Sequence, residues 1–249
     1  MIAAENLTKN YGRTPVLRGL TLRAEPGEIT LLVGANGAGK STTMKVLAGL
    51  IRPGGGRATV HGLDVVTDRI NAQRLLSYLP QSPSFHLRLT CAEVLRFYAR
   101  LRGVIVSRCD AMLELTGLSE VARVRTGKLS GGMRQRLGLA LLLLADAPVL
   151  LLDEPGLSLD PSWRKRLQGT LQFEAQRGKT VLITTHLVAE WNGVADRCLL
   201  CGDGVIEREL DPTDLPHDFG DSTSSLHECD REMPSPVSVE NELRSIVSI

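Results

Sequence analysis

The sequence predicts an α/β fold with a mostly parallel central sheet, an N-terminal antiparallel β subdomain and an inserted α-helical subdomain. Three mostly apolar runs, at 28–33, 149–154 and 180–186, have the pattern of strands that are buried on both faces. Segments with helical periodicity lie between these runs. Residues 82–145 differ from the rest because helical patterns dominate there. We therefore expect a helical subdomain of about 82–145 within the α/β core.

The first eighty residues predict the N-terminal subdomain and the beginning of the central sheet. Tyr11 is expected in a turn, either as a solvated aromatic or as a ring that stacks on a purine. The expected elements are, in order, a strand at 2–8, a turn at 9–12, a strand at 16–28 that ends in a Pro26-Gly27 turn, the strand at 28–33, a flexible turn at 54–56, a short strand at 58–61, a short helix at 70–75 and a strand at 76–81 that stops at Pro80.

The stretch from Gly34 to Thr42 fits the phosphate-loop pattern of Gly, four residues and Gly-Lys-Ser/Thr. It lies between an expected strand and an expected helix, whose apolar spacing continues to Ile51 before Pro53. Small residues allow the backbone to surround an anion, and the free N–H groups of the first helical turn point at it. The alternative is a glycine-rich turn, but the residue types and both flanking elements agree with a P-loop NTPase core. The candidate nucleotide-binding residues are Gly34, Asn36, Gly37, Ala38, Gly39, Lys40, Ser41 and Thr42.

Two residues of this loop carry the chemistry that a nucleotide requires. Lys40 is expected to contact the β- and γ-phosphates as a point charge. The Ser41 hydroxyl is expected to hold Mg²⁺, which keeps most of its other ligands as water and phosphate oxygen.

The helical subdomain is expected to begin with a helix that is capped by Thr90 and Glu93. The apolar stripe of this helix consists of Val94, Leu95, Tyr98 and Leu101. A second helix is expected at 107–116, followed by a loop of mixed charge at 119–128.

A third helix of this subdomain is expected to begin with Ser130 as its N-cap and to bury the run 137–145. Gly131 and Gly132 follow the cap, so small residues again meet a helix N-terminus. Ser130, Gly131 and Gly132 are therefore a second candidate anion site. Alone the pattern is weak, because Ser-Gly-Gly before a helix is usually only a cap.

Two adjacent acids, Asp153 and Glu154, end the apolar strand that begins at Val149. Burial of such a pair is costly unless the carboxylates meet a cation or a water molecule that is to be activated. We expect Asp153 to lie behind the Mg²⁺ and Glu154 to accept a proton from the attacking water. The alternative is that the acids only cap the following turn.

His186 ends the apolar run that begins at Thr180, in a strand expected to be parallel to the one before Glu154. A lone histidine is more often structural, but this position favours contact with the γ-phosphate. The other elements expected in this part are a loop at 155–161 that contains Asp160, a helix at 163–176 with Gly178 as its stop, a short helix at 189–194 and a hairpin at 197–206 around Asp203-Gly204.

Charge is unevenly distributed along the 249 residues, although the formal net charge is only +1. Residues 211–249 contain nine acidic and two basic side chains, which leaves residues 1–210 with a net charge of +8. A basic body suits a polyphosphate ligand and an anionic lipid surface nearby. The basic residues are too scattered to indicate a nucleic-acid partner.

The five cysteines include Cys198 and Cys201, which have the spacing of metal ligands, with His227 and Cys229 further along. A zinc or redox site would use such a set. The simpler interpretation is an apolar strand in which positions three apart point to opposite faces. Cys91 and Cys109 are expected to be lone buried thiols.

The core is expected to be complete by about Leu210, which divides the chain into a folded domain at 1–210 and an acidic tail rich in Pro and Ser at 211–249. After Ser238 the tail has the spacing of a short amphipathic helix, which would be marginal alone in water. The longest apolar run, 137–145, is too short to cross a bilayer, and no signal segment opens the chain. We therefore expect a cytoplasmic protein that acts on a membrane only through a partner.

Taken in order, these motifs resemble the nucleotide-binding subunit of an ATP-binding-cassette (ABC) transporter over about residues 2–210. Besides the phosphate loop and the two acids, Gln81 lies where that family has its glutamine loop, and Tyr11 where it has its adenine-stacking aromatic. Residues 129–133 resemble the family signature, with Met133 where glutamine is usual. The segment 158–160 resembles the loop that meets the other subunit, with Ser158 as a mild departure, and His186 resembles the switch histidine.

The resemblance implies that residues 1–210 form an ABC ATPase domain and that this domain forms a head-to-tail homodimer. In that dimer ATP lies between the phosphate loop of one subunit and Ser130, Gly131 and Gly132 of the other. The resemblance also implies that Ser41 and Asp153 hold Mg²⁺. It further implies that Gln81 lies close to the nucleotide, senses it, and belongs to both the metal-binding and the catalytic residues. Asp160 is implied to contribute at the nucleotide interface. Since Glu154 and His186 are present, an active ATPase is expected.

A separate membrane permease is a further implication of the resemblance, and hence a peripheral location on the inner face of the cell membrane. The segment 95–103 is similar to export-type subunits, so export is the expected direction. The alternative is a soluble family member without a permease, which acts in cofactor or metal-cluster assembly. A DNA-repair ATPase of the same fold is disfavoured, because it needs a long coiled coil between the phosphate loop and the signature. A two-cassette translation factor is disfavoured because the sequence contains one phosphate loop.

Overall fold

The structure is a computed structural model, and it describes residues 1–213 of the chain. The amphipathic helix expected after Ser238, and the candidate ligands His227 and Cys229, lie outside the described residues.

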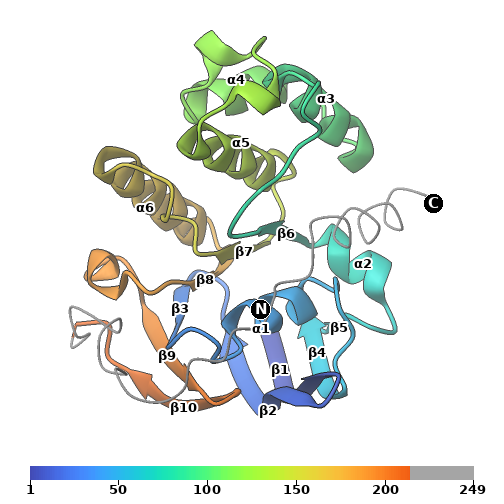
Figure 1. Ribbon diagram of the computed structural model, residues 1–249, viewed down its shortest axis with the longest axis vertical. Helices are drawn as coiled ribbons and strands as arrows, with labels where there is room; N and C mark the ends of the chain where they lie inside the picture. Colours follow the sequence, from blue (N-terminus) through green and yellow to red (C-terminus); the bar gives the residue numbers. More distant parts are fainter. Residues whose placement is uncertain (214–249) are drawn as a thin grey trace.

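Two β-sheets form the lower half of the molecule in the view of Figure 1. The smaller sheet has the strand order β2-β1-β4-β5 and is antiparallel throughout. The larger sheet has the order β10-β9-β3-β8-β7-β6, and all its pairings are parallel except the one between β9 and β10. The predicted fold class is therefore confirmed. The strands are β1 Ile2–Tyr11, β2 Thr14–Ala24, β3 Ile29–Val33, β4 Gly55–Val60, β5 Leu63–Asp64, β6 Leu76–Leu79, β7 Val149–Asp153, β8 Thr180–Thr184, β9 Arg197–Gly202 and β10 Val205–Leu210.

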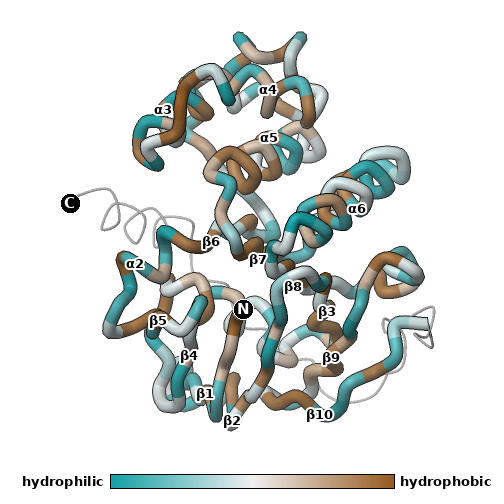
Figure 2. Tube along the Cα trace, turned by 180° about the vertical axis from the view of Figure 1, so that it is seen from behind, coloured by the Kyte–Doolittle hydropathy of each residue, from teal (hydrophilic) through white to brown (hydrophobic). Residues whose placement is uncertain are grey.

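Helices connect these strands along the chain. Three of the helices, α3, α4 and α5, lie together above the larger sheet in Figure 1. In Figure 2, α6 alternates between brown and teal along its length, as expected of a helix with one buried face. The α-helices are α1 Lys40–Leu47, α2 Arg69–Arg74, α3 Cys91–Arg102, α4 Arg108–Leu115, α5 Gly131–Leu144 and α6 Pro161–Gln176, and the 3₁₀ turns are η1 Ser119–Val121, η2 Thr126–Lys128 and η3 Val188–Trp191.

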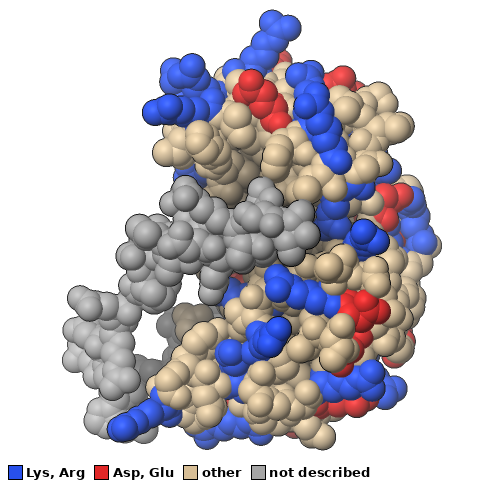
Figure 3. Space-filling model, turned by 90° about the vertical axis from the view of Figure 1, so that its right-hand side faces the viewer, with Lys and Arg blue, Asp and Glu red and all other residues tan. Residues whose placement is uncertain are grey.

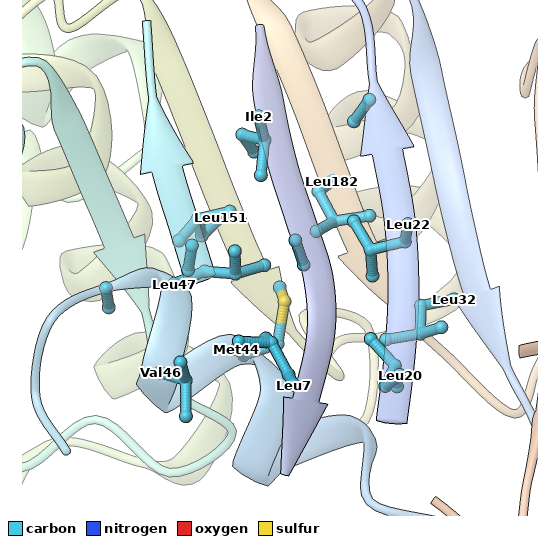
Figure 4. Close-up of a cluster of buried hydrophobic side chains, with 14 of the residues drawn as sticks. Ile2, Leu7, Leu20, Leu22, Leu32, Met44, Val46, Leu47, Leu151 and Leu182 are labelled. Atoms are coloured by element: carbon cyan, nitrogen blue, oxygen red, sulfur yellow. The ribbon is translucent and has the colours of Figure 1, made fainter. Parts of the chain in front are cut away.

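The space between the two sheets is filled by a core that Figure 4 shows in detail. Successive residues of β7 point to opposite faces of the larger sheet: Leu151 joins this core, whereas Leu150 and Leu152 join a second core on the other face. Both faces are thus covered, which explains why this strand is apolar at every position except its last. Burial of apolar surface on both sides holds β7 in place and so determines where its last residue, Asp153, lies.

The helices α3, α4 and α5 share a third core, which includes Cys91, Cys109 and Leu137. Helix α5 also packs on the larger sheet, because Leu139, Leu142 and Leu143 belong to the second core. A helix that is apolar on most of its circumference is buried on most sides. Helix α5 therefore connects the helical part of the molecule to the sheet that carries Asp153.

Several element boundaries differ from the sequence-based expectations. Strand β1 continues to Tyr11, and β4 begins at Gly55, so the turns expected at 9–12 and 54–56 are shorter. Helix α1 ends at Leu47 rather than continuing to Ile51, because the chain leaves the helical region at Gly49, whose φ is +67°. The short helix expected at 189–194 is only the 3₁₀ turn η3, and the second strand of the last hairpin extends to Leu210.

The expected stripe of α3 is only half correct. The capping box of Thr90 and Glu93 is present, and Val94 and Leu95 are buried. Tyr98 and Leu101, however, are exposed, because α3 turns its buried face toward α4 and α5 through Cys91 and Ala99 instead.

Lys and Arg side chains on the face that Figure 3 presents are spread over both the helical part and the sheets. They do not gather in one patch in this view. This distribution agrees with the scattered basic residues of the sequence.

A cluster of ion pairs joins the connection between α5 and β7 to the connection between α6 and β8. Asp146, in the connection between α5 and β7, accepts from Lys179 at 2.5 Å, and Arg177 and Arg108 lie 3.4 and 3.6 Å away. The hydrogen bond from Lys179, together with the charges of Lys179 and Arg177, lowers the pKa of Asp146 to about 2. Because the folded pKa lies below the ordinary value of 3.8, the carboxylate stabilises the fold above about pH 4 and loses this effect as the pH falls toward 2.

We expect Asp146→Asn to lower the free energy of unfolding at pH 7 by about 1–2 kcal/mol, since water screens a side chain that is one-third exposed. Urea unfolding between pH 2 and pH 7 measures this difference. It should shrink as the pH falls from about 4 toward 2, because the carboxylate of the unfolded wild type becomes neutral near pH 4 and that of the folded wild type only near pH 2. Asp110→Asn, at an exposed position of α4, is the matched control and should change the unfolding midpoint much less. A difference that stays constant down to pH 2 would contradict the ionic origin of the effect.

Candidate functional site

The predicted phosphate loop connects β3 to α1, as expected. Gly34, Gly37 and Gly39 have φ values of +147°, +86° and +101°, which residues other than glycine rarely adopt. A Cβ atom at Gly34 would lie 2.0 Å from the carbonyl oxygen of Cys201, so this position has no room for a side chain. The loop therefore needs glycine both for its backbone conformation and for its close packing on the hairpin of β9 and β10.

That hairpin holds the loop through two hydrogen bonds to one main-chain carbonyl oxygen. The Cys201 thiol and the Gly204 N–H both donate to the carbonyl oxygen of Ala38, at 3.1 and 3.2 Å. The Gly204 carbonyl in turn accepts from the N–H of Arg18 in β2. Sequence reasoning gave these residues no role at the site, because nothing in an Asp-Gly hairpin indicates what its turn packs against.

Lys40 is buried at the beginning of α1 and points back into the loop. Its ammonium group donates to the carbonyl oxygens of Gly34 and Ala35, at 2.7 and 3.0 Å. The first turn of α1 contains no acidic residue, and its N-cap, Gly39, has no side chain to occupy the free N–H groups. A buried cation, unoccupied N–H donors and a helix N-terminus at one place fit a phosphate group. ATP therefore matches the donor set of this loop.

The carboxylate of Asp153 accepts hydrogen bonds from hydroxyl groups on three different elements. Ser41 of α1 donates to its Oδ1 at 3.1 Å, Tyr78 of β6 to its Oδ2 at 3.5 Å, and Thr184 of β8 also donates to Oδ1. Asp153 is nearly fully buried, and none of these partners carries a positive charge. A buried carboxylate beside a serine hydroxyl, without a cationic partner among them, fits Mg²⁺, which prefers oxygen ligands.

The same arrangement perturbs the phenol of Tyr78. Burial raises the pKa of Tyr78 far above its usual range, and the nearby Asp153 carboxylate raises it further. Tyr78 therefore remains a neutral hydrogen-bond donor to Asp153 at any physiological pH. Sequence reasoning placed it in a strand and assigned it no function.

Glu154 follows β7 with a φ of +48°, a left-handed conformation that is uncommon for residues other than glycine. Its N–H points at Thr184 and donates to both the carbonyl and the hydroxyl oxygen of that residue, at 3.0 and 3.1 Å. Its buried carboxylate approaches His186, with 2.9 Å from Oε2 to Nδ1 and 3.3 Å to the backbone N. The structure thus brings Asp153, Glu154 and His186 to neighbouring strand ends, beside the phosphate loop.

Gln81 is not joined to this group. It lies exposed beyond the end of β6, and no hydrogen bond in the described part of the chain connects its side chain to Ser41 or Asp153. Its expected place among the metal and catalytic residues therefore stays a prediction.

The second candidate anion site lies at the beginning of α5. Ser130 is the N-cap, as expected, and its Oγ accepts from the N–H of Met133 at 3.2 Å. Gly132 packs against Ser158, since a Cβ atom there would lie 2.9 Å from the Ser158 carbonyl oxygen. Figure 1 shows that α5 belongs to the helical part, whereas α1 lies with the two sheets. Within residues 1–213, no hydrogen bond joins Ser130, Gly131 or Gly132 to the phosphate loop.

The two remaining predicted site residues lie at the surface. Asp160 caps α6, where its Oδ1 accepts from Ser162 and from the N–H of Trp163, and these bonds lower its pKa. Tyr11, expected in a turn, is instead the last residue of β1, and the residue is 48% exposed. The Lys9 ammonium lies 5.6 Å from the centre of that ring. An exposed aromatic face of this kind is free to stack on a base.

A buried amide connects the beginning of α5 to the segment after Glu154. The side chain of Gln135 donates from Nε2 to the carbonyl oxygen of Pro155 at 3.1 Å. The sequence predicts an exposed position for Gln135, because a polar residue in the first turns of a helix usually faces solvent. This prediction is wrong, since Gln135 is buried.

Cys198 and Cys201 point to opposite faces of the larger sheet, as expected from their spacing. Cys198 belongs to the core beneath α6, and Cys201 to the core between the two sheets. Burial raises the pKa of both thiols, to about 12 for Cys198 and about 11 for Cys201, so both are neutral. A pair on opposite faces cannot ligate one metal ion together.

Comparison with known proteins agrees with this geometry. The family model described as ABC transporter matches residues 17–156, a range that includes the phosphate loop, residues 130–132 and both acids. The chain belongs to the ABC transporter family. It is an ABC ATPase, so ATP is its nucleotide and hydrolysis of ATP is its reaction.

Two curated ABC relatives illustrate the similarity. The chain is 38% identical over 210 residues to the uncharacterized ABC transporter ATP-binding protein YxlF of Bacillus subtilis, covering 83% of this chain and 69% of that protein. It is 37% identical over 204 residues to the Nod factor export ATP-binding protein I of Rhizobium meliloti, covering 80% of this chain and 61% of that protein.

A solved ABC cassette has the same fold. The dimeric structure of MJ0796, a bacterial ABC transporter cassette, superposes with a TM-score of 0.79 at 26% identity and covers 85% of this chain and 99% of that one. The same cassette in a post-hydrolysis state, bound to ADP and Pi, gives a TM-score of 0.78. In residues 1–213 of the present chain, every helix is too short or too polar to cross a membrane.

Proposed function

We propose that this chain is the ATP-hydrolysing subunit of an ABC exporter and that two copies close head to tail around two ATP molecules. The observation that carries this proposal is the separation of two anion sites on one chain. The phosphate loop lies at α1, whereas Ser130, Gly131 and Gly132 lie at α5 in the helical part. Each site alone offers half of a nucleotide pocket, so a second copy would complete it. The dimeric cassette MJ0796 supports this arrangement by its similarity.

Each half of the shared pocket has a defined task in this proposal. Lys40 and the loop N–H groups bind the phosphates, and the exposed ring of Tyr11 stacks on adenine. Ser130, Gly131 and Gly132 of the opposite subunit face the γ-phosphate, and Asp160 contributes at the same interface. ATP then acts as a bridge between the subunits, and its hydrolysis releases them.

Four residues carry the reaction. Ser41 and Asp153 would hold Mg²⁺, which neutralises developing phosphate charge when it is bound. The Glu154 carboxylate orients the attacking water and accepts its proton. The His186 ring, 2.9 Å from that carboxylate, holds Glu154 in place and contacts the γ-phosphate. Gln81, which is exposed beyond β6, senses the nucleotide.

The transport role is an extension of the ATPase. We propose a separate permease as partner and a peripheral location on the inner face of the cell membrane, with residues 1–210 as the ATPase domain and 211–249 as an added tail. Similarity to a Nod factor export protein favours export. The alternative, a soluble ATPase for cofactor or cluster assembly, predicts that the tagged chain purifies without any membrane protein, whereas the transporter predicts a stoichiometric polytopic subunit.

Mixing two inactive variants tests the shared pocket. Lys40→Ala disables the phosphate loop and Ser130→Arg blocks the opposite face, so each homodimer should be inactive. A mixed dimer has one pocket that is built from an intact loop and an intact Ser130. We therefore expect the mixture to regain ATP hydrolysis that neither variant has alone, as measured by phosphate release.

The control replaces the second partner by the double variant Lys40→Ala/Ser130→Arg. Every pocket of that mixture lacks Lys40, so it should stay inactive. The proposal is wrong if the first mixture also stays inactive while a monomeric wild-type chain hydrolyses ATP at the full rate.

A further inference from the structure

We propose that Thr184 is a positioning residue for ATP hydrolysis, because one buried hydroxyl links the carboxylate of Asp153 to the backbone of Glu154. This inference rests on the proposed roles of the two acids. It adds a residue whose fully buried side chain acts only through Asp153 and Glu154.

Thr184 is the last residue of β8 and is paired in register with Asp153, the last residue of β7. Its side chain has no solvent exposure. Its hydroxyl donates its single proton to Asp153 Oδ1. The same oxygen accepts from the N–H of Glu154 at 3.1 Å, so both hydrogen-bonding functions of the hydroxyl are used on neighbouring acids.

Glu154 requires such an acceptor because its backbone is strained. A left-handed conformation is costly for a residue with a side chain, and it persists only where the surroundings impose it. The N–H of Glu154 is bound by two oxygens, both of which belong to Thr184. Thr184 thereby fixes the direction in which the Glu154 side chain leaves the strand, toward His186.

Asp153 gains a donor that does not depend on the state of the phosphate loop. Ser41 and Thr184 both donate to Oδ1, but Ser41 belongs to α1 and is itself a proposed metal ligand. Thr184 remains available to orient Oδ1 when the Ser41 oxygen serves the metal ion. Partners of this kind typically change metal affinity or activity by about 10–100-fold when they are removed.

A threonine in the neighbouring strand supplies a matched control. Thr30, in β3, is equally buried, but its hydroxyl has no hydrogen-bond partner among the described residues. The exchange of threonine for valine preserves shape and removes only the hydroxyl. Thr30→Val therefore tests the same exchange in the same sheet without the loss of a bond to either acid.

Thr184→Val, Thr184→Ser and Thr30→Val in the full chain test the proposal with two readouts. We expect Thr184→Val to lower kcat by about 10–100-fold, with a smaller change in KM for ATP. Calorimetric titration of Mg²⁺ into the ADP-bound protein should give about 10-fold weaker binding, a readout that does not depend on turnover. Thr184→Ser, which keeps the hydroxyl, should stay close to the wild type in both values, and so should Thr30→Val.

Wild-type kcat and Mg²⁺ affinity in Thr184→Val would overturn the proposal. So would a Thr184→Ser variant as impaired as Thr184→Val, since that result would indicate packing rather than the hydroxyl. If Thr184→Val does not fold, as judged by circular dichroism, the comparison of Thr184→Ala with Thr184→Ser decides the question in the same way. The activity of Glu154→Gln distinguishes a failure of the proposed function from a failure of this inference. If the proposed function is wrong, Glu154→Gln stays fully active. If only the inference about Thr184 is wrong, Glu154→Gln is still impaired.

Discussion

Replacement of Glu154 by glutamine should slow ATP hydrolysis by about 10²–10⁴-fold while ATP still binds, because the amide cannot accept the proton of the attacking water. Glutamine has nearly the same shape, and the backbone bonds from Glu154 to Thr184 do not involve its side chain. The nucleotide should therefore remain intact between two subunits. Size-exclusion chromatography with ATP and Mg²⁺ should show a stable dimer, and phosphate release measures the loss of rate.

Glu120→Gln is the control for this exchange, because Glu120 is an exposed acid of the helical part. It should hydrolyse ATP like the wild type and should not accumulate a dimer. Undiminished turnover in Glu154→Gln would remove Glu154 from the reaction. A variant that binds ATP but remains a monomer would count against the shared pocket.

Lys40→Ala should abolish tight ATP binding. Among the described residues, the buried ammonium is the only charged donor that the structure places inside the loop, where the carbonyl oxygens of Gly34 and Ala35 hold it. Each charge-assisted hydrogen bond to phosphate contributes about 1.5–3 kcal/mol, so the loss of two contacts lowers affinity by roughly 10²–10⁴-fold. Calorimetric titration with ATP, without turnover, measures this change.

Lys45→Ala tests whether the effect is specific to position 40. Lys45 lies in the last turn of the same helix and is exposed, so its loss changes the net charge of the chain equally. ATP affinity should stay near the wild-type value in that variant. Equal affinities of Lys40→Ala and the wild type would show that the loop does not bind the phosphates.

The phosphate loop and the acid pair could be predicted because their signals are local. A strand covered on both faces must be apolar along its length, so Asp153 and Glu154 stand out at the end of β7. The pattern of glycines with Lys40 is equally local, since the positive φ values occur within the motif itself. The N-cap at Ser130 depends on only the next three residues.

Other parts of the site depend on which strands are neighbours, which a single sequence does not reveal. The link from Thr184 to Asp153 requires β8 to pair with β7 in one particular register. The contacts of Cys201 and Gly204 with Ala38 require the hairpin to reach the phosphate loop. The wrong prediction for the outer half of the α3 stripe has a similar cause, because helical spacing identifies apolar positions but not the neighbours that would cover them.

The close approach of Gly34 to the hairpin has a consequence for directed evolution of this ATPase. A side chain introduced at residue 34 would collide with a carbonyl oxygen of Cys201, and every amino acid at position 201 carries that same oxygen. No compensating mutation at position 201 can remove the obstacle, so genetic selections for revertants of a Gly34 variant should recover glycine itself.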